Sequence, residues 1–358
     1  MFSIVNMTIV GRYMPVVKKT MESIPVRPAE EGRCMKQILI TGALGQLGSE
    51  IAIQLRREYS NAQVILTDIR PDPKSAISEG GPYYTVDCRD GRQLGELVER
   101  YRVDTIYHLA AILSATAESN PQYAWDCNMN GLLTVLEVAR EHRCSLFTPS
   151  SIGAFGPSTP KKFTPQDTVQ RPTSIYGVTK VAGELLCDYY HHKYDVDTRG
   201  VRYPGIVSNL TVPGGGTTDY AVEIYYAAVK QGHYECPLQG DTYLDMMYMP
   251  DAVNAAIQIM EADPARLRHR NAFNVGAMSF CPEEQAAYIR THIPNFTISY
   301  RVDPVRQAIA DSWPDCLEDY AARVEWGWKP SYDLASMTAD MLQVIRDRHV
   351  REGGRYDE

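Results

Sequence analysis

Three side chains that could together act on an alcohol occur in one part of the sequence. Tyr176 and Lys180 lie four residues apart in SIYGVTKVAGELL, so a helix would place both on one face. Ser151 lies upstream, at the end of the apolar run SLFTPSS. A phenol has a pKa of about 10 and is a poor base at neutral pH, but a nearby ammonium group favours the phenolate. The pattern predicts Tyr176 as a general base assisted by Lys180, with Ser151 orienting the substrate oxygen.

A glycine-rich stretch could bind a nicotinamide dinucleotide, the partner of such a reaction. TGALGQLGSE places Gly42, Gly45 and Gly48 between the apolar run QILI and a helical pattern. In this context glycines let the backbone approach a pyrophosphate at the N-terminus of a helix. Asp68 ends the next apolar run, where a carboxylate binds ribose hydroxyls and repels a 2′-phosphate. NAD is therefore predicted over NADP, although the nearby Arg70 could pair with such a phosphate.

Both patterns also have plain structural interpretations. The glycines alone would be an ordinary turn between a strand and a helix, and a tyrosine and a lysine at this spacing are often just a helix surface. The elements around them decide between the two interpretations. Segments of strand length alternate here with helical patterns, which predicts βαβ units and an α/β fold, a Rossmann doubly wound parallel sheet. The expected strands cover residues 37–41, 63–68, 83–88, 104–110 and 145–151, and the expected helices cover 49–59, 90–101 and 125–142.

The pattern changes after residue 200. PGGG at 213–216 breaks regular structure and predicts a loop, and helical patterns at 218–231 and 250–261 then mix with short strands. We expect a smaller C-terminal substrate-binding lobe over the C-terminal edge of the sheet. The expected domains are an N-terminal extension (1–35), an NAD-binding Rossmann domain with the Ser–Tyr–Lys site (36–205) and a mainly substrate-binding lobe whose chain crosses back to the sheet (206–358).

Composition limits the classes of protein to which the chain can belong. Of its 358 residues 44% are hydrophobic and 22% are charged, which is typical of a globular protein with a sizeable core. A net charge of −8 argues against nucleic acid or an anionic membrane as the main partner. No apolar run approaches the roughly 20 residues that span a bilayer. The eight cysteines are scattered, with no CxxC pair, so we expect no metal site and reduced thiols.

The first 35 residues differ from the rest of the chain. Basic residues lie there among small, apolar and hydroxyl residues, and acidic residues occur only from Glu22 onward. The segment is either a disordered extension or an organelle transit peptide. We expect a mitochondrial location on the second interpretation and a cytoplasmic one otherwise.

The glycine-rich stretch, the upstream Ser151 and the YxxxK pair occur in an order typical of one superfamily. From about residue 36 to 345 the chain resembles the short-chain dehydrogenases/reductases, and its GxxGxxG and YxxxK spacing resembles their extended branch. The resemblance implies NAD as the cofactor, with Lys180 binding the nicotinamide ribose, Asp87 meeting the adenine amino group and Asn128 bracing the active-site helix. The complete set of expected cofactor contacts is Gly42, Leu44, Gly45, Gln46, Leu47, Gly48, Asp68, Ile69, Asp87, Cys88, Leu109, Ala110, Ala111, Asn128, Tyr176, Lys180 and Pro204.

Members of this extended branch act on different substrates. Nucleotide-sugar enzymes usually carry an arginine before the aspartate of a stretch like RDYIHVxD, but LDMMYMPDAV has Leu244 there, which cannot bind a phosphate. LSAT, PGGGTTDYA, DSWP and ARVEWGWKP resemble the short-chain type of L-threonine 3-dehydrogenase. This resemblance implies that L-threonine and NAD give 2-amino-3-oxobutyrate and NADH, a step toward glycine and acetyl-CoA. The alternatives are a nucleotide-sugar epimerase or dehydratase and a non-enzymatic dinucleotide sensor.

Several residues in these segments suit a small zwitterionic substrate. Thr217 and Thr218 could hold its carboxylate, Asp219 its ammonium group, and Trp313 could close one wall. Each has a structural alternative, since Thr217 could cap a helix, Asp219 could favour a helix N-terminus and Trp313 could be core. The expected substrate contacts are Ser114, Ser151, Tyr176, Thr217, Thr218, Asp219 and Trp313.

The resemblance also implies a protein partner, a second copy of the chain. Enzymes of the extended branch commonly dimerise through two helices of each subunit. The helices near 120–141 and 176–194 are the candidates here, so we expect a homodimer.

Overall fold

A six-stranded parallel sheet forms the centre of the computed structural model, which describes residues 35–71, 77, 80–210 and 216–351. The strands β1 and β2 are buried along their whole length, as expected for strands covered on both faces. The order β3-β2-β1-β4-β5-β7 is that of a doubly wound sheet, so the predicted Rossmann α/β fold is confirmed. The strands are β1 (Ile38–Thr41), β2 (Val64–Asp68), β3 (Tyr83–Thr85), β4 (Thr105–His108), β5 (Ser145–Phe147) and β7 (Thr198–Arg199).

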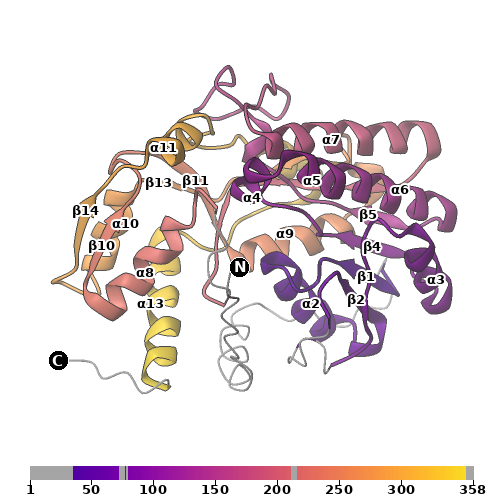
Figure 1. The fold of residues 1–358 in the computed structure, drawn as a ribbon, viewed down its shortest axis with the longest axis horizontal. Coiled ribbons are helices and arrows are strands. Elements are labelled where there is room, and N and C mark those ends of the chain that lie inside the picture. The colour runs from indigo at the N-terminus through magenta and orange to yellow at the C-terminus, as the bar shows by residue number, and fades with distance from the viewer. Residues whose placement is uncertain (1–34, 72–76, 78–79, 211–215, 352–358) are drawn as a thin grey trace, which may run out of the picture.

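Helices cover both faces of this sheet (Figure 1). Side chains alternate across a strand, so Ile38 and Ile40 join one buried cluster and Leu39 joins the other. The two clusters fix the sheet between its helices and leave the carboxyl ends of the strands as the edge that a ligand can reach. Over the first cluster lie α2 (Gln46–Glu58) and α9 (Met249–Glu261); over the second lie α3 (Gly91–Tyr101), α6 (Gly131–His142) and α7 (Ile175–Tyr194), with α4 (Ser114–Ser119) packed beside α7.

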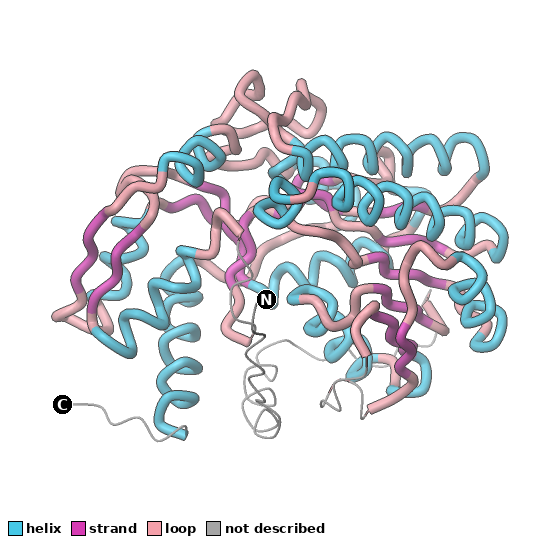
Figure 2. Tube along the Cα trace, in the orientation of Figure 1, coloured by secondary structure: helices cyan, strands magenta, loops and turns pink. Residues whose placement is uncertain are grey.

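The later part of the chain builds a smaller lobe beside the sheet, on the left in Figures 1 and 2. Met246 of β11 pairs with Gly205 of β9, so this lobe is hydrogen-bonded to the strand end that follows β8. Trp326 and Trp328 pack instead into the cluster under α2 and α9, because the chain crosses back to the large sheet. The elements are β8 (Val201–Tyr203), β9 (Gly205–Val207), α8 (Tyr220–Gln231), β10 (His233–Cys236), β11 (Leu244–Tyr248), β12 (Phe273–Asn274), β13 (Met278–Phe280), α10 (Pro282–Arg290), β14 (Thr297–Tyr300), α11 (Pro304–Asp311), α12 (Tyr320–Trp326) and α13 (Leu334–Arg351).

Two expected elements are interrupted near the carboxyl edge of the sheet. The predicted helix over 125–142 is instead α5 (Pro121–Trp125), a π-helical turn (Asp126–Asn130) and then α6. A π-helical turn inserts an extra residue into a helix and is frequent at functional sites. The predicted strand over 145–151 is divided into β5 and β6 (Ser150–Ser151), because a proline between them lacks the N–H that a ladder needs.

Two predicted segments fall outside the described residues. They are residues 1–34 of the expected extension and residues 213–215 of the expected loop. Within the described ranges, no helix is both long and apolar enough to cross a membrane.

Candidate active site

The turn between β1 and α2 is built on glycines where the backbone leaves no room for a side chain. Gly42 has a φ of +70°, and a Cβ there would lie 2.5 Å from the backbone nitrogen of Ala110. A Cβ at Gly48 would lie 2.2 Å from the carbonyl oxygen of Gly42, so α2 packs directly on the turn. The N-cap residue, Gly45, has no side chain to bind the N–H groups of the first helical turn. These N–H groups and the helix dipole suit a phosphate.

Asp68 ends β2 beside this turn and is only 5% exposed. Its carboxylate accepts hydrogen bonds from the N–H of Leu44 at 3.0 Å and from the guanidinium of Arg70 at 2.9 and 3.2 Å. Burial alone would raise the pKa of Asp68, but the hydrogen bonds from Arg70 and Leu44 together lower it below its usual value. Asp68 is therefore an anion at neutral pH. The side chain of its partner Arg70 is 56% exposed.

A cavity runs from the glycine turn past the carboxyl ends of β1 to β4. On its far side the carboxylate of Asp87 accepts a hydrogen bond from Arg89 Nε at 3.0 Å. Gln46 and Leu47 are not part of the lining; they lie in the first turn of α2, where Leu47 packs against the core. The predicted cofactor contacts that line the cavity are Gly42, Gly45, Asp68, Ile69, Asp87, Cys88, Leu109, Ala110 and Ala111.

The three predicted catalytic side chains meet at the carboxyl end of β6. A Cβ placed on Gly153 would lie 3.2 Å from the Tyr176 ring and 3.5 Å from Ser151 Oγ, so both side chains flank the same point. Lys180 Nζ lies 5.4 Å from the centre of the Tyr176 ring. It donates a hydrogen bond to the carbonyl oxygen of Pro149 at 2.7 Å. The structure therefore brings together the hydroxyl, phenol and ammonium groups that the sequence pattern singled out.

The helix that carries Tyr176 is pressed against this strand end. Ser174 caps α7 by accepting a hydrogen bond from the N–H of Gly177 at 3.0 Å. A Cβ at Gly177 would lie 2.2 Å from the carbonyl oxygen of Gly153, so only glycine permits the approach. Tyr176 is consequently buried in a small apolar cluster with Ala117 of α4.

Asn128 joins the loop after β4 to the same helix. Its side chain accepts a hydrogen bond from the N–H of Ile112 at 2.7 Å and donates to the Ile112 carbonyl oxygen at 3.1 Å. It also donates to Thr179 Oγ1 at 3.2 Å, and Thr179 is the residue before Lys180. These bonds tie the loop after β4 to α7, and the role of Asn128 in bracing the active-site helix stays a prediction.

Sequence reasoning gave no role to His108, which the structure places at this edge. The side chain is buried at the end of β4, and its Nδ1 shares a hydrogen bond with Thr41 Oγ1 at 2.8 Å. Burial and, to a smaller extent, the charge of Lys180 lower the pKa of His108 to about 3, so its ring is neutral at physiological pH. The position of His108 at a strand end, like that of Asp68, was the signal that could have found it.

Glu184 is a second residue that sequence reasoning missed. It lies on α7, is 6% exposed and forms an ion pair with Arg202 of β8 at 2.8 Å. The signal was present in the spacing, because Tyr176, Lys180 and Glu184 follow one another at intervals of four residues.

Some predicted substrate contacts lie close to this edge. Ser114 is buried at the start of α4, the helix that packs beside α7. Thr218 reaches the strand end that follows Pro204, since a Cβ at Gly205 would lie 2.8 Å from its methyl carbon. Thr217 is buried but does not cap α8, whose N-cap is the residue two positions later.

The other two predicted substrate contacts make structural interactions in this conformation. The Asp219 carboxylate accepts a hydrogen bond from the N–H of Gly216 at 2.6 Å, within its own turn before α8. Trp313 is 7% exposed and belongs to the core of the smaller lobe, in the cluster that includes Ile152 and Phe155 beyond Ser151. Their contact with a substrate stays a prediction.

The described residues contain no cluster of metal ligands. No group of three or more histidine, cysteine or acidic side chains among them could hold an ion. The cysteines in these ranges are free thiols. Burial raises the pKa of Cys88, on the cofactor cavity, to about 12, so this thiol is protonated at neutral pH.

Comparison with known proteins gives close relatives over most of the chain. The model of the NAD-dependent epimerase/dehydratase family matches residues 38–276. An uncharacterized epimerase/dehydratase of Staphylococcus saprophyticus is 55% identical, over 89% of this chain and 99% of its own. The solved L-threonine dehydrogenase of Clostridium difficile is 55% identical, with a TM-score of 0.87 over 88% of this chain and 99% of that chain. A holo GalE-like L-threonine dehydrogenase from Cupriavidus necator is 49% identical, with a TM-score of 0.83 over 86% and 99%.

These relatives correct the expected location. The curated relatives at 54% and 55% identity belong to Staphylococcus species, and bacteria have no mitochondria. The predicted mitochondrial location is therefore wrong. The basic, hydroxyl-rich composition of the first 35 residues misled the prediction, because composition alone does not separate a transit peptide from an untargeted extension.

The residues of the cavity fit NAD. The bare N–H groups at the start of α2 suit its pyrophosphate, and the anionic Asp68 suits ribose hydroxyls and opposes a 2′-phosphate. Small side chains at Ala110 and Ala111 leave room for the dinucleotide to lie close to the backbone. NAD is therefore the cofactor that both the cavity and the matching family model indicate. With this fold, this cavity and a family match over most of its length, the chain belongs to the NAD-dependent epimerase/dehydratase family.

Proposed function

We propose that the protein oxidises the secondary alcohol of L-threonine to 2-amino-3-oxobutyrate, with NAD as the hydride acceptor. The observation that carries the proposal is the meeting of Ser151, Tyr176 and Lys180 at the carboxyl end of β6, next to the cofactor cavity. The 55% identity to an L-threonine dehydrogenase supports threonine as the alcohol. The product would pass to glycine and acetyl-CoA through a separate ligase.

Tyr176 is the general base of the proposed reaction. Its phenolate oxygen accepts the proton of the substrate hydroxyl, and bound NAD supplies the acceptor for the hydride that leaves the same carbon. Ser151 Oγ donates a hydrogen bond to the substrate oxygen and orients it. The Pro149 carbonyl holds the ammonium group of Lys180 near the Tyr176 ring, where its positive charge attracts a phenolate.

The substrate is a zwitterion, and hydroxyl groups of the smaller lobe would bind its carboxylate. Thr217 and Thr218 supply those groups, and Thr218 already lies against the strand end at Gly205. Asp219 would bind the ammonium group after releasing its hydrogen bond from Gly216. In the same proposal Ser114 offers a further hydroxyl and Trp313 closes one wall.

One residue argues against a nucleotide-sugar substrate. Leu244, in the position where the resemblance places a phosphate-binding arginine, is fully buried and pairs with Phe280. Neither side chain can bind a diphosphate. Epimerase or dehydratase activity on a nucleotide sugar is the alternative that the following experiment must exclude.

The experiment measures initial rates of NADH formation with NAD and L-threonine, L-allo-threonine or L-serine, and repeats the threonine assay with NADP. UDP-glucose is followed separately by its sugar product, because epimerisation and dehydration form no net NADH. We expect turnover with L-threonine and NAD, and a much lower rate with NADP because of Asp68. Binding of NAD without turnover of threonine, together with conversion of UDP-glucose, would replace the proposal with the nucleotide-sugar alternative.

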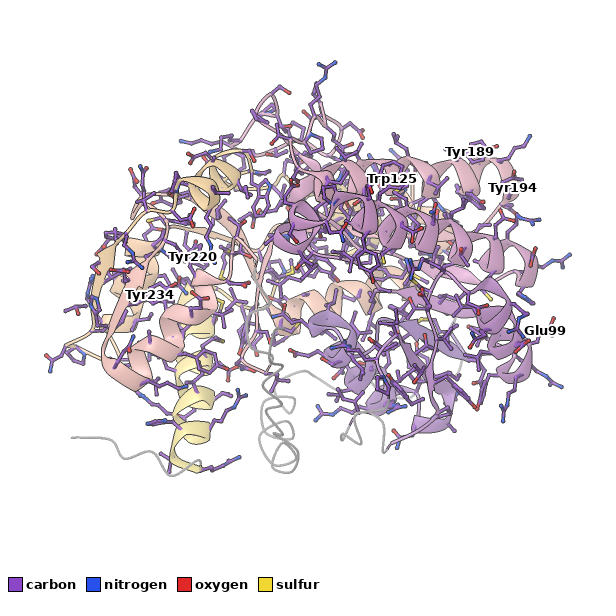
Figure 3. All side chains as sticks on the ribbon, viewed as in Figure 1. Glu99, Trp125, Tyr189, Tyr194, Tyr220 and Tyr234 are labelled. Carbon is purple, nitrogen blue, oxygen red and sulfur yellow. The ribbon has the colours of Figure 1, made fainter. Side chains whose placement is uncertain are left out.

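We also propose that the protein is a homodimer joined through α5, α6 and α7. Trp125, Leu133, Leu185, Tyr189 and Tyr194 on these helices are 41–62% exposed, and large apolar side chains exposed on neighbouring helices suit a protein–protein interface. Figure 3 shows Trp125, Tyr189 and Tyr194 along the outer side of these helices. Light scattering of the purified protein should give twice the chain mass of 40.2 kDa, and a monomer mass would contradict the proposal.

A further inference from the structure

One face of α7 contacts three consecutive residues, Pro149 and the two residues of β6 that follow it. Lys180 donates to the Pro149 carbonyl, as described above, and Glu184 accepts a hydrogen bond from Ser150 Oγ. The Tyr176 ring lies beside Ser151. Glu184 therefore lies on the same face of α7 as Tyr176 and Lys180, one helical turn after Lys180.

The Glu184 carboxylate is buried and fully bound. Arg202 donates to it through Nε at 3.0 Å and through its terminal nitrogen at 2.8 Å, the two-point geometry that fixes a carboxylate most firmly. Gln170 Nε2 donates to the second oxygen at 2.8 Å. Arg202 and Glu184 are 7% and 5% exposed in their side chains, so neither moves freely.

Arg202 is held in turn by the strands around it. It donates to the carbonyl oxygen of Gln166 at 2.7 Å and to Asn274 Oδ1 at 3.1 Å. In the ladder between β6 and β8, Arg202 lies directly opposite Ser150. Side-chain and backbone bonds thus converge on Ser150 from two sides.

Stability alone is a poor reason to bury such a pair. Taking two charges out of water costs about as much as their attraction returns, and apolar residues of equal volume often serve a core as well. An apolar core could not, however, bind the Ser150 hydroxyl and fix the direction of the strand that carries Ser151.

We propose that Glu184 is a positioning residue of this active site. Clamped by Arg202, its carboxylate holds Ser150 and thereby keeps Ser151 in register with Tyr176 and Lys180. The inference deepens the proposed function and rests on it for its kinetic readout, whereas its geometric readout is independent of the substrate.

The test is Glu184→Gln, which keeps the shape of the side chain but removes the charge and presents an amide to Arg202. We expect kcat with L-threonine to fall about tenfold to a hundredfold, because small displacements of catalytic groups cost rate on this scale. The KM for NAD and the affinity for NADH should stay within about twofold, since the cofactor cavity is built by other residues.

Ser150→Ala keeps the inference testable if Glu184→Gln folds poorly. It removes one hydroxyl, should lower kcat in the same direction and should add little to the effect of Glu184→Gln, because both act through one contact. Additive losses would show that Glu184 does not act through Ser150 and would overturn the inference.

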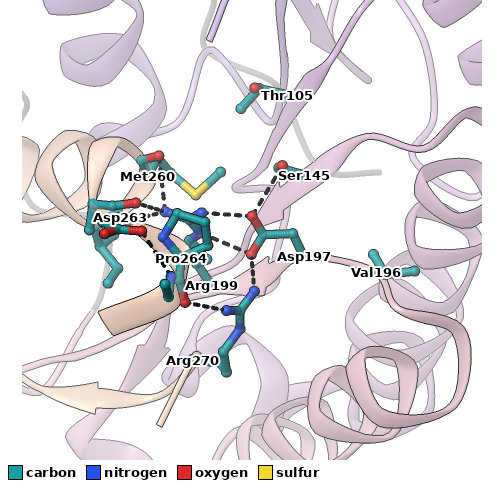
Figure 4. A network of polar contacts seen from close by, with 12 residues as sticks. Thr105, Ser145, Val196, Asp197, Arg199, Met260, Asp263, Pro264 and Arg270 are labelled. Carbon is teal, nitrogen blue, oxygen red and sulfur yellow. Dashed lines mark hydrogen bonds and ion pairs between the residues drawn. The ribbon is translucent and has the colours of Figure 1, made fainter. Parts of the chain in front are cut away.

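Asp197→Asn is the matched control. Asp197 also pairs with a buried arginine, Arg199 at 2.7 Å, but this pair lies at the end of α9 (Figure 4). The Asp197→Asn variant should have a lower melting temperature and an unchanged kcat. The inference is overturned if Glu184→Gln behaves in the same way.

A crystal structure of Glu184→Gln separates the two proposals. We expect Ser151 Oγ to move relative to the Tyr176 ring whether or not threonine is the substrate. An unmoved Ser151 would overturn the inference, whereas a wild type that is inactive with threonine would overturn only the proposed function.

Discussion

Two buried arginines three residues apart, Arg199 of β7 and Arg202 of β8, pair with carboxylates in different parts of the molecule. Arg199 binds Asp197 and also donates to the carbonyl oxygens of Ile259, Met260 and Ala262 at the end of α9 (Figure 4). A cation at this position satisfies carbonyl groups that have no partner within the helix. Its network therefore closes a helix end against the sheet.

Arg202 lies on a separate strand, β8, and reaches α7 rather than the end of α9. Its partner is Glu184 on α7, the helix that also carries Tyr176 beside Ser151. Both networks are buried Arg–carboxylate pairs, so chemistry alone does not tell them apart. Their position does, because Arg202 lies on β8, which pairs with β6 beside Ser151, whereas Arg199 lies at the end of α9.

The largest effect should follow from Arg202→Met. Removing one partner leaves the Glu184 charge buried and uncompensated, which costs about 3–5 kcal/mol of unfolding free energy. We expect the folded fraction to lose most of its kcat as well. Urea unfolding and active-site titration with NADH, followed by assay, would measure both; full activity per folded molecule would contradict the positioning role.

Arg199→Met should cost about as much stability, roughly 3–5 kcal/mol, because Asp197 loses its main partner and the end of α9 loses a donor. We predict that the kcat of Arg199→Met per folded molecule stays at the wild-type value. A loss of activity equal to that of Arg202→Met would show that both networks act on the site.

Lowering the pH should produce a smaller effect, on the stability that Asp197 contributes. Burial raises the pKa of Asp197, but hydrogen bonds and charges of Arg199 and Arg270 outweigh it, and the pKa in the folded state lies below its usual value. The folded state therefore binds fewer protons, and the contribution of Asp197 is present at neutral pH and lost as the pH falls through the lowered value. The cost of Asp197→Asn in urea unfolding should shrink between pH 7 and about pH 3. A cost independent of pH would show that the charge of Asp197 does not contribute.

The smallest effect should come from Arg270→Ala. Arg270 donates to Asp197 at 2.8 Å from the outer side of the network and to the Pro264 carbonyl. Arg199 remains as the main partner, so we expect a loss of about 1 kcal/mol or less. Thermal unfolding would measure it, and a loss as large as that of Arg199→Met would reverse the order of the two arginines.

Local patterns predicted much of the fold and the site. The glycine turn, Asp68 and the Tyr176–Lys180 pair were visible because each depends on residues close in sequence. The parallel sheet followed from the alternation of strands and helices, and Ser151 from its place at a strand end. The expected helix over 125–142 failed where a π-helical turn intervenes, since periodicity does not register one inserted residue.

Other features depend on residues far apart in the chain. Spacing alone places Glu184 on the same helix face as Tyr176 and Lys180. Its partners Arg202 and Ser150, however, come from β8 and β6, two segments elsewhere in the chain. No local pattern pairs them. Likewise the low pKa of His108 follows from its burial and, to a smaller extent, from the charge of Lys180, which only the packed structure shows.

In the proposed reaction, Tyr176 takes the hydroxyl proton of L-threonine while hydride leaves for NAD. The most direct measurement compares NADH formation from L-threonine and NAD by wild type and Tyr176→Phe, with NADH affinity measured for both. We predict threonine-dependent turnover in the wild type and a loss of about 10²-fold or more in the variant, the scale of general base catalysis, with NADH affinity unchanged. A variant that keeps turnover close to the wild-type rate would contradict the account.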